Sequence, residues 1–235
     1  ETLMRAAAAL GGEEAVLELS AHTTGAGLTP LHVATAEGHL GVLETLVARR
    51  CDHTAPCAQG KTLLLHAGEN GHVAVCSFLL AARADLATSC TPDGETLLHV
   101  AARFGDPDFI GQVVAWNADL SAHDREGWTP LHEAAHWGAA AVEALLRAQA
   151  DVQARSRDGE TPLHVALQGY EQTAACEVLL HWRADPAAPD VDGEVALHVA
   201  ARRGNSEACR LLLVGGAEAN AADAVGRRPL DLARG

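Results

Sequence analysis

The residues whose types and spacing most suggest chemistry are His132, Glu133 and His136. They form the pattern H-E-x-x-H within the stretch "TPLHEAAHWG". On a helix, two histidines four residues apart share one face, where they can bind zinc, and a neighbouring glutamate can act as a general base. The pattern indicates a metal-dependent hydrolase only in the right structural context, so the elements that carry it have to be considered first.

The composition favours small, tightly packed helices. Hydrophobic residues make up 48% of the 235 residues, but aromatic residues only 3%, and alanine and leucine are abundant. A sheet protein would need runs of β-branched and aromatic residues instead. The net charge of -14 repels nucleic acid and anionic membranes, so we expect neither as a partner. No apolar run reaches the roughly 18 residues that would span a membrane.

The start of the chain, "ETLMRAAAAL", lacks both the layout of a signal peptide and an initiator methionine, so we expect a fragment of a longer protein. Cys76, Cys176 and Cys209 each precede an apolar run, where a free cysteine behaves as a small buried hydrophobe. Without a secretion signal, the six cysteines predict reduced thiols and a cytoplasmic or nuclear location.

A repeat runs through the chain. Seven near-matches to G-x-T-P-L-H are separated by 33, 34, 33, 32, 34 and 33 residues. The second half of each unit recurs as well, in segments such as "VCSFLLAARAD" and "CEVLLHWRAD". A single unit of this length cannot bury its own apolar face, so neighbouring units must stack. The matches begin at Gly27, Gly60, Gly94, Gly127, Gly159, Gly193 and Gly226.

This pattern resembles the ankyrin repeat over nearly the whole chain. The resemblance implies an all-α solenoid in which each unit has a turn, two antiparallel helices and a loop that ends in a β-hairpin, here called a finger. We expect a monomer with one domain over 1–235. It comprises a capping unit 1–26, full repeats 27–59, 60–93, 94–126, 127–158, 159–192 and 193–225, and a partial cap 226–235. The fourth repeat lacks a residue near "WGAAAVEAL", and the fifth has an extra one near "LQGYEQTA".

Local signals agree with helix pairs. Thr129 can cap a first helix through its hydroxyl, and Pro130 suits the first helical turn because its missing N–H is not needed there. Gly138 is expected to end that helix with a positive φ. Asp-Gly pairs such as Asp158-Gly159 predict tight turns at the fingertips.

The repeat also explains the opening motif. His132 occupies a position that His32, His99, His164 and His198 fill in other units. The resemblance implies that this histidine is neutral and holds the loops of adjacent units. Glu133 replaces a valine, His136 falls on a surface position, and no third ligand follows, so we expect no metal, no cofactor and no enzyme. The histidines are spread by the repeat rather than gathered. The stretch "APCAQGKT" resembles a nucleotide loop but follows no apolar strand, so nucleotide binding is set aside.

Positions outside the framework carry the expected binding function. The resemblance implies that a partner meets the concave groove of fingers and first helices. Large residues at groove-facing positions gather in the third and fourth repeats, and Trp and Arg are the types enriched at interface hot spots. Alternatively, Trp128 packs only on the neighbouring finger. The predicted partner-binding residues are Arg103, Phe104, Arg125, Trp128, His136 and Trp137.

The expected function is a non-catalytic protein–protein interaction scaffold that binds a peptide or protein surface. Acidic finger residues such as Glu126 and Asp192 favour basic residues flanking an apolar anchor, although a solvated face is the alternative. A second hypothesis is a regulatory segment that packs on the rest of a larger chain; the hydrolase is a remote third. Asn220 is a candidate for hydroxylation, which the resemblance implies for an Asn with a Leu eight residues and an acid two residues before it.

Overall fold

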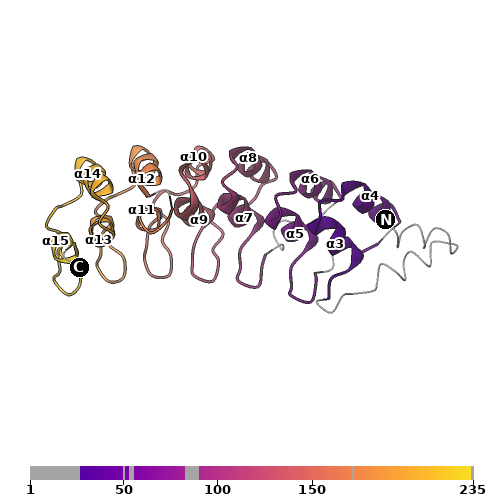
Figure 1. Cartoon of the computed structure of the whole chain (residues 1–235), viewed down its shortest axis with the longest axis horizontal. Helices are drawn as coiled ribbons and strands as arrows, with labels where there is room; N and C mark the ends of the chain where they lie inside the picture. Colours follow the sequence, from indigo (N-terminus) through magenta and orange to yellow (C-terminus); the bar gives the residue numbers. More distant parts are fainter. Residues whose placement is uncertain (1–26, 50, 53–55, 83–89, 171, 234–235) are drawn as a thin grey trace. The chain divides into compact units, whose positions relative to one another are not determined.

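The computed structural model describes residues 27–49, 51–52, 56–82, 90–170 and 172–233. The chain divides into two compact units, Glu1–Leu97 (unit 1) and Leu98–Gly235 (unit 2), and each is described by itself. Helix labels follow Figure 1. The capping unit expected over 1–26 lies outside the described residues.

The described part of unit 1 consists of two helix pairs. Within each pair the two helices pack on each other, and the two pairs stack, with α3 on α5 and α4 on α6. The helices are α3 (Pro30–Ala36), α4 (Leu40–Ala48), α5 (Leu63–Glu69) and α6 (Val73–Ala81).

Unit 2 repeats the same arrangement. Figure 1 shows its first helices (α7, α9, α11, α13) in one row, its second helices (α8, α10, α12, α14) in another, and the fingers extending from the first row. The all-α prediction is confirmed. The helices are α7 (Leu97–Phe104), α8 (Pro107–Ala115), α9 (Pro130–Trp137), α10 (Ala139–Arg147), α11 (Pro162–Ala166), α12 (Gln172–His181), α13 (Ala196–Arg202), α14 (Ser206–Val214) and α15 (Pro229–Leu232).

The core consists of aliphatic side chains that each helix turns toward its neighbours. Leu43 and Leu79 in unit 1, and Ile110 and Leu145 in unit 2, are fully buried. Cys76 and Cys176 are buried free thiols, and burial raises the pKa of each to about 12. These two cysteines therefore pack as small apolar residues, as predicted, whereas Cys209 is partly exposed.

In the first helices other than α5, where Leu65 stands at the third position, the third residue of the helix fixes its start as much as the cap does. Thr129 and Pro130 stand at the expected N-cap and first-turn positions of α9. The backbone N–H of Thr129 donates to Nδ1 of His132 at 3.1 Å, and its hydroxyl lies 2.9 Å from the same nitrogen. In α15 Asp231 replaces the histidine, and its carboxylate accepts the backbone N–H of Arg228 at 2.9 Å. In both α9 and α15, a backbone N–H at the start of the helix that has no partner within the helix is thus given a hydrogen-bond acceptor.

Gly138 corrects one expectation. Its φ is -178° and its ψ is 151°, which is extended backbone rather than the predicted positive φ. Glycines that end other first helices, such as Gly105 and Gly204, do have positive φ, at 74° and 66°. The reason is the residue missing from the fourth repeat. Gly138 directly precedes Ala139, so it serves as C-cap of α9 and N-cap of α10 at once.

The fingers are hydrogen-bonded turns, and among the described residues the only strand-like pairing is one isolated bridge between Cys90 and Thr96. At the tip before α9, the N–H of Gly127 donates to the carbonyl of Asp124 at 3.1 Å. Gly127 has a φ of 78°, and a Cβ there would lie 2.7 Å from the backbone nitrogen of Arg157 in the next finger. Glycine is therefore required both by the turn and by the close approach of neighbouring fingers.

Candidate protein-binding site

The scaffold histidines of unit 2 join neighbouring repeats. Nε2 of His132 lies 3.0 Å from the carbonyl oxygen of Glu160 in the next finger, and His164 makes the same contact with Glu194. Because Nδ1 of His132 accepts a backbone N–H, the proton must sit on Nε2, which donates to the carbonyl. Burial lowers the pKa of His132 to about 4, so the ring is neutral at pH 7, as the resemblance implied. His99 and His198 contact the carbonyls of Trp128 and Arg227 in the same way.

Glu133, which the sequence offered only as the general base of H-E-x-x-H, is a buried carboxylate. Its side chain is only 8% exposed. Oε1 accepts a charge-assisted bond from Nε of Arg103 at 2.6 Å and a second bond from Nε1 of Trp137 at 3.0 Å. Glu133 therefore links the end of α7 to the end of α9, and it holds two of the predicted binding residues in fixed positions.

Four aromatic side chains lie against one another around the end of α9. We call Trp128, His136, Trp137 and Tyr170 the ring cluster. The rings of Trp137 and Tyr170 are stacked with centroids 5.0 Å apart and an interplanar angle of 24°. His136 meets Tyr170 at 5.6 Å, edge to face, and the tilted ring of Trp128 at 5.8 Å. Such contacts add to the stabilisation from area burial alone.

The structure brings together four of the six predicted binding residues: Arg103, Trp128, His136 and Trp137. Phe104 follows Arg103 at the end of α7 and is 50% exposed, while Arg125 lies exposed in the finger before Gly127. His136 was expected at a plain surface position. It is instead half-buried at the centre of the ring cluster, where its Nδ1 is buried and has no hydrogen-bond partner.

Trp128 also differs from the expectation of an exposed hot spot. It is half-buried, and its ring stacks on His132 with centroids 6.4 Å apart. Its backbone N–H donates to the Asp124 carboxylate at 2.7 Å. Trp128 thus supports the ring cluster from the finger that precedes α9, and the exposed aromatic area comes from Trp137 and Tyr170, at 38% and 72%.

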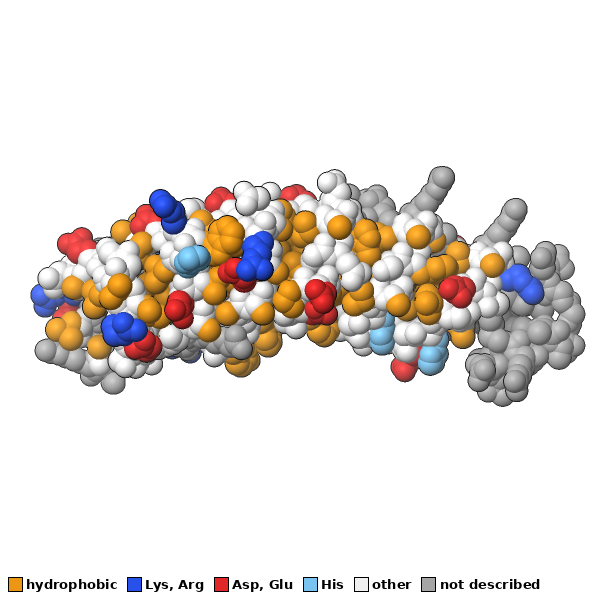
Figure 2. Space-filling model, turned by 90° about the horizontal axis from the view of Figure 1, so that it is seen from above, with side chains coloured by type: hydrophobic (Ala, Val, Ile, Leu, Met, Phe, Trp, Pro, Cys, Tyr) orange, Lys and Arg blue, Asp and Glu red, His pale blue; other side chains and the backbone are white. Residues whose placement is uncertain are grey.

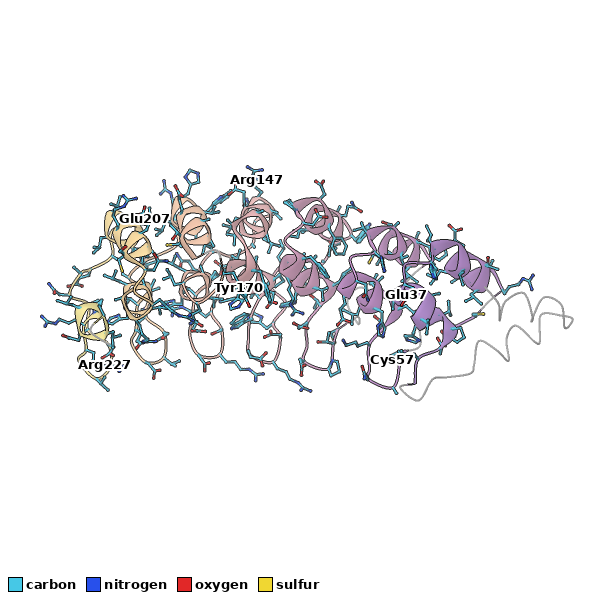
Figure 3. All side chains as sticks on the ribbon, viewed as in Figure 1. Glu37, Cys57, Arg147, Tyr170, Glu207 and Arg227 are labelled. Atoms are coloured by element: carbon cyan, nitrogen blue, oxygen red, sulfur yellow. The ribbon has the colours of Figure 1, made fainter. Side chains whose placement is uncertain are left out.

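Tyr170 was missed, although the sequence held a signal for it. The fifth repeat carries one extra residue at this turn. The chain there passes directly over the end of α9, so that the N–H of Tyr170 donates to the carbonyl of His136 at 2.9 Å. The approach is so close that a Cβ on Gly169 would lie 2.1 Å from that oxygen. Figure 3 labels Tyr170 beside α9 and α11.

The opening motif is not assembled as a metal site. His132 bonds to a carbonyl, Glu133 to Arg103 and Trp137, and His136 packs among the aromatic rings. The one group of three metal-ligating side chains found among the described residues lies elsewhere, in unit 1.

Not all of the acidic residues expected to face a partner are free to do so. Glu194 is buried and paired with Arg202 and Arg227, and the Glu160 carboxylate accepts a bond from Gln168 at 2.6 Å. Glu126, Asp158 and Asp192 remain exposed at successive fingertips, although Arg125 and Arg157 stand beside the first two. Of these three fingertips, two therefore present charges of both signs and the third, at Asp192, is acidic.

The second helices form a different surface. Figure 2 views it from the side of the second helices, where hydrophobic side chains are interspersed with acidic and basic ones. Leu213 and Val214 at the end of α14 are exposed apolar side chains. Asn220 is exposed in the last finger, and its hydroxylation stays a prediction.

No helix among the described residues is long and apolar enough to cross a membrane.

Comparison with known proteins agrees with this architecture. The family described as "Ankyrin repeats (3 copies)" matches residues 3–90 and 98–190, and "Ankyrin repeat" matches 192–224. The chain belongs to the ankyrin repeat family, whose members are generally protein–protein interaction modules and typically not catalytic. A search of curated protein sequences gave no match.

Two solved structures illustrate the similarity. The ankyrin repeat domain of human ASB11 aligns with a TM-score of 0.80 and 29% identity, covering 88% of this chain and 92% of that one. The ankyrin repeat domain of Bcl-3, described as a unique member of the IkappaB protein family, aligns with a TM-score of 0.77 and 27% identity, covering 89% of this chain and 95% of that one.

Proposed function

We propose that the chain is a non-catalytic protein–protein interaction scaffold, and that unit 2 contacts its partner through the ring cluster together with Arg103 and Phe104. The observation that carries this proposal is the stacked, exposed pair of Trp137 and Tyr170. Contiguous exposed aromatic area of this kind marks interaction surfaces more often than it marks plain solvent-facing surface.

The pair is also held rigidly before any partner arrives. Trp137 is tied to the buried Glu133 carboxylate, and the backbone of Tyr170 is tied to His136. A partner that covers these rings therefore loses little conformational entropy in ordering them, which favours affinity. Aromatic and arginine side chains that are fixed in this way are the usual anchors of an interface.

The charges suggest what the partner offers. The Arg103 guanidinium is bonded to Glu133, so its charge is compensated inside the scaffold. The exposed carboxylates of Glu126, Asp158 and Asp192 at the fingertips remain available to a partner. An apolar side chain on the Trp137–Tyr170 pair, with a Lys or Arg reaching toward the fingertips, satisfies both features.

Affinity purification with the wild-type chain, followed by quantitative mass spectrometry, tests the proposal. The partner recovered is then titrated against a Trp137→Ala, Tyr170→Ala variant. We expect the affinity of the folded variant to fall by at least ~30-fold, which corresponds to about 2 kcal/mol, at a temperature where its melting curve shows that it is still folded.

The matched control is Leu213→Ala, Val214→Ala, which removes exposed apolar side chains from the end of α14. Equal affinity of both double variants for the partner contradicts the proposed site. If no protein binds the wild-type chain in trans, the result instead supports a regulatory segment that packs on its own longer chain.

A further inference from the structure

Unit 1 contains a cluster of metal-ligating side chains that the repeat does not account for. His32 in α3, Cys57 in the following finger and His66 in α5 place one donor atom each within 4.8 Å of the others. The expectation that the histidines are spread by the repeat is therefore wrong for these residues. Figure 3 labels Cys57 on the loop side of the first helices.

Cys57 replaces a residue that has a defined task in the other fingers. The counterparts three residues before the finger glycine use a side-chain oxygen to accept a backbone N–H, as Asp124 does from Trp128 and Ser156 does from Glu160. The same bond is made by Thr91, Asp190 and Asp223. A thiol is a weak acceptor, so the turn alone gives no reason for cysteine at this position.

His66 is not one of the scaffold histidines. The scaffold position in the second repeat is held by Leu65, and His66 follows it. The counterparts of His66 are Val33, Val100, Glu133, Val165 and Val199. Nε2 of His66 is buried and has no hydrogen-bond partner. A buried polar atom without a partner is costly, so its presence requires an explanation.

His32 is a scaffold histidine that lacks the usual acceptor. It is 2% exposed, and its Nε2 has no hydrogen-bond partner, whereas Nε2 of His132 lies 3.0 Å from a finger carbonyl. Burial lowers the pKa of His32, and the carbonyl of Lys61, which is the counterpart here, acts to raise it but forms no hydrogen bond with Nε2.

We propose that His32, Cys57 and His66 form a zinc site, with Nε2 of each histidine and Sγ of the cysteine as ligands and solvent in the fourth position. Nδ1 of His32 lies 2.8 Å from the hydroxyl of Thr29 and accepts the backbone N–H of Thr29 at 3.3 Å. When zinc binds at Nε2, the ring proton moves to Nδ1, which then donates to the Thr29 hydroxyl in place of the longer bond from the backbone. This is the usual support for a zinc-bound histidine. Cys57 gives up its thiol proton to solvent when the ion binds.

The geometry is close to what zinc needs. Ligand bonds of ~2.0 Å to nitrogen and ~2.3 Å to sulfur in a tetrahedral site put the donor atoms roughly 3.5 Å apart. The two imidazole rings are nearly perpendicular, at 84°, with centroids 5.4 Å apart. Small side-chain rotations close the remaining gap. Two nitrogens and one sulfur suit zinc, whereas calcium and magnesium require oxygen ligands.

Two variants test the site without disturbing the repeat, because each restores a residue that other repeats use at that position. They are Cys57→Ser, as in Ser156, and His66→Val, as in Val165. The full chain, reduced and freed of metal with a chelator, is titrated with zinc alone and with Co²⁺ as a spectroscopic substitute. We expect one equivalent to bind, with a sulfur-to-cobalt charge-transfer band, and each variant to weaken zinc binding at least 100-fold.

Two controls separate the site from adventitious surface binding. Cys90→Ser and His39→Ala alter exposed residues of unit 1 and should leave zinc affinity unchanged. X-ray absorption of the wild-type zinc complex needs no variant and should show one sulfur and two nitrogens in the first shell. The proposal is overturned by absence of binding, by a shell without sulfur, or by unchanged affinity in both ligand variants.

Discussion

His132 connects backbone segments that lie 31 residues apart, because its two ring nitrogens bond to Thr129 and to the carbonyl of Glu160. Both partners are main-chain groups, which cannot be removed by mutation. Deleting the imidazole therefore leaves a buried N–H and a buried C=O without partners, and the cost is mainly their desolvation.

His132→Ala should accordingly lower the free energy of unfolding by about 1–3 kcal/mol. The measurement is urea denaturation at pH 7.5, with His123→Ala as the control, since His123 is an exposed histidine of the same unit. A variant at position 132 as stable as the wild type would show that its hydrogen bonds do not hold the finger.

The buried carboxylate of Glu133 is a second residue whose replacement has a predictable result. Most repeats use valine at its position, as in Val165 and Val199. Glu133→Val removes a buried charge and fills the space with an apolar side chain, so stability should change by less than about 1 kcal/mol. Trp137 loses its hydrogen-bond acceptor, and partner affinity should fall by roughly 10-fold. Calorimetry of folding and of partner binding on the same sample distinguishes the two effects; unchanged affinity would mean that Glu133 does not position the ring cluster.

At the scale of the element, the turn after α11 shows how a single extra residue builds part of a site. The loop approaches α9 closely enough that only glycine fits at position 169. Tyr170 is placed on Trp137 by that loop path rather than by any helix face.

Gly169→Ala should destabilise the chain by about 1–3 kcal/mol, because the new Cβ forces the turn away from the His136 carbonyl. Gly111→Ala is the matched control. A Cβ at Gly111 meets nothing within 4 Å, and the residue lies inside α8, so alanine should be neutral or stabilising by up to about 1 kcal/mol. Thermal unfolding of both variants provides the comparison, and equal shifts would argue against the close approach.

The sequence predicted the elements better than the site. The repeat period, the Thr-Pro helix caps and the Asp-Gly turns predicted the helices and fingers, because helix starts and tight turns depend on local chemistry. Arg103 and Trp137 were found since large residues at helix ends stand out from the framework. The burial of Glu133 could not be deduced, because it depends on which side chain the neighbouring repeat places above it. The position of Tyr170 depends on the path of its loop, and the backbone conformation of Gly138 depends on a shortened turn. The meeting of His32, Cys57 and His66 required the stacking of two repeats.

At the scale of the whole molecule, the repeated use of buried neutral histidines has a collective effect. Burial lowers the pKa of His32, His99, His132 and His164 below the value they have when unfolded. The unfolded chain therefore binds more protons as the pH falls below 6.5, and stability decreases toward acid. Glu160, whose pKa is raised by partial burial, acts in the opposite sense at lower pH.

For His132 alone, the fall from 6.5 to about 4 implies a loss of roughly 2 kcal/mol between pH 7.5 and pH 5. Urea denaturation at the two pH values should show this loss, and His132→Asn should reduce the difference. Equal free energies of unfolding at both pH values, in wild type and variant, would mean that the histidines are not held neutral by the fold.

The stacking of each helix pair on its neighbours also bears on how the molecule responds to force. In the described part of unit 2, α15 packs on α13, α14 packs on α12 and α13 packs on α11, so contacts between repeats run from each repeat to its neighbours. Pulled by its ends in an optical trap, unit 2 would peel pair by pair from the C-terminal side. With a period of 33 residues, each rupture would lengthen the tether by roughly 11 nm, since an extended chain gains about 3.4 Å per residue.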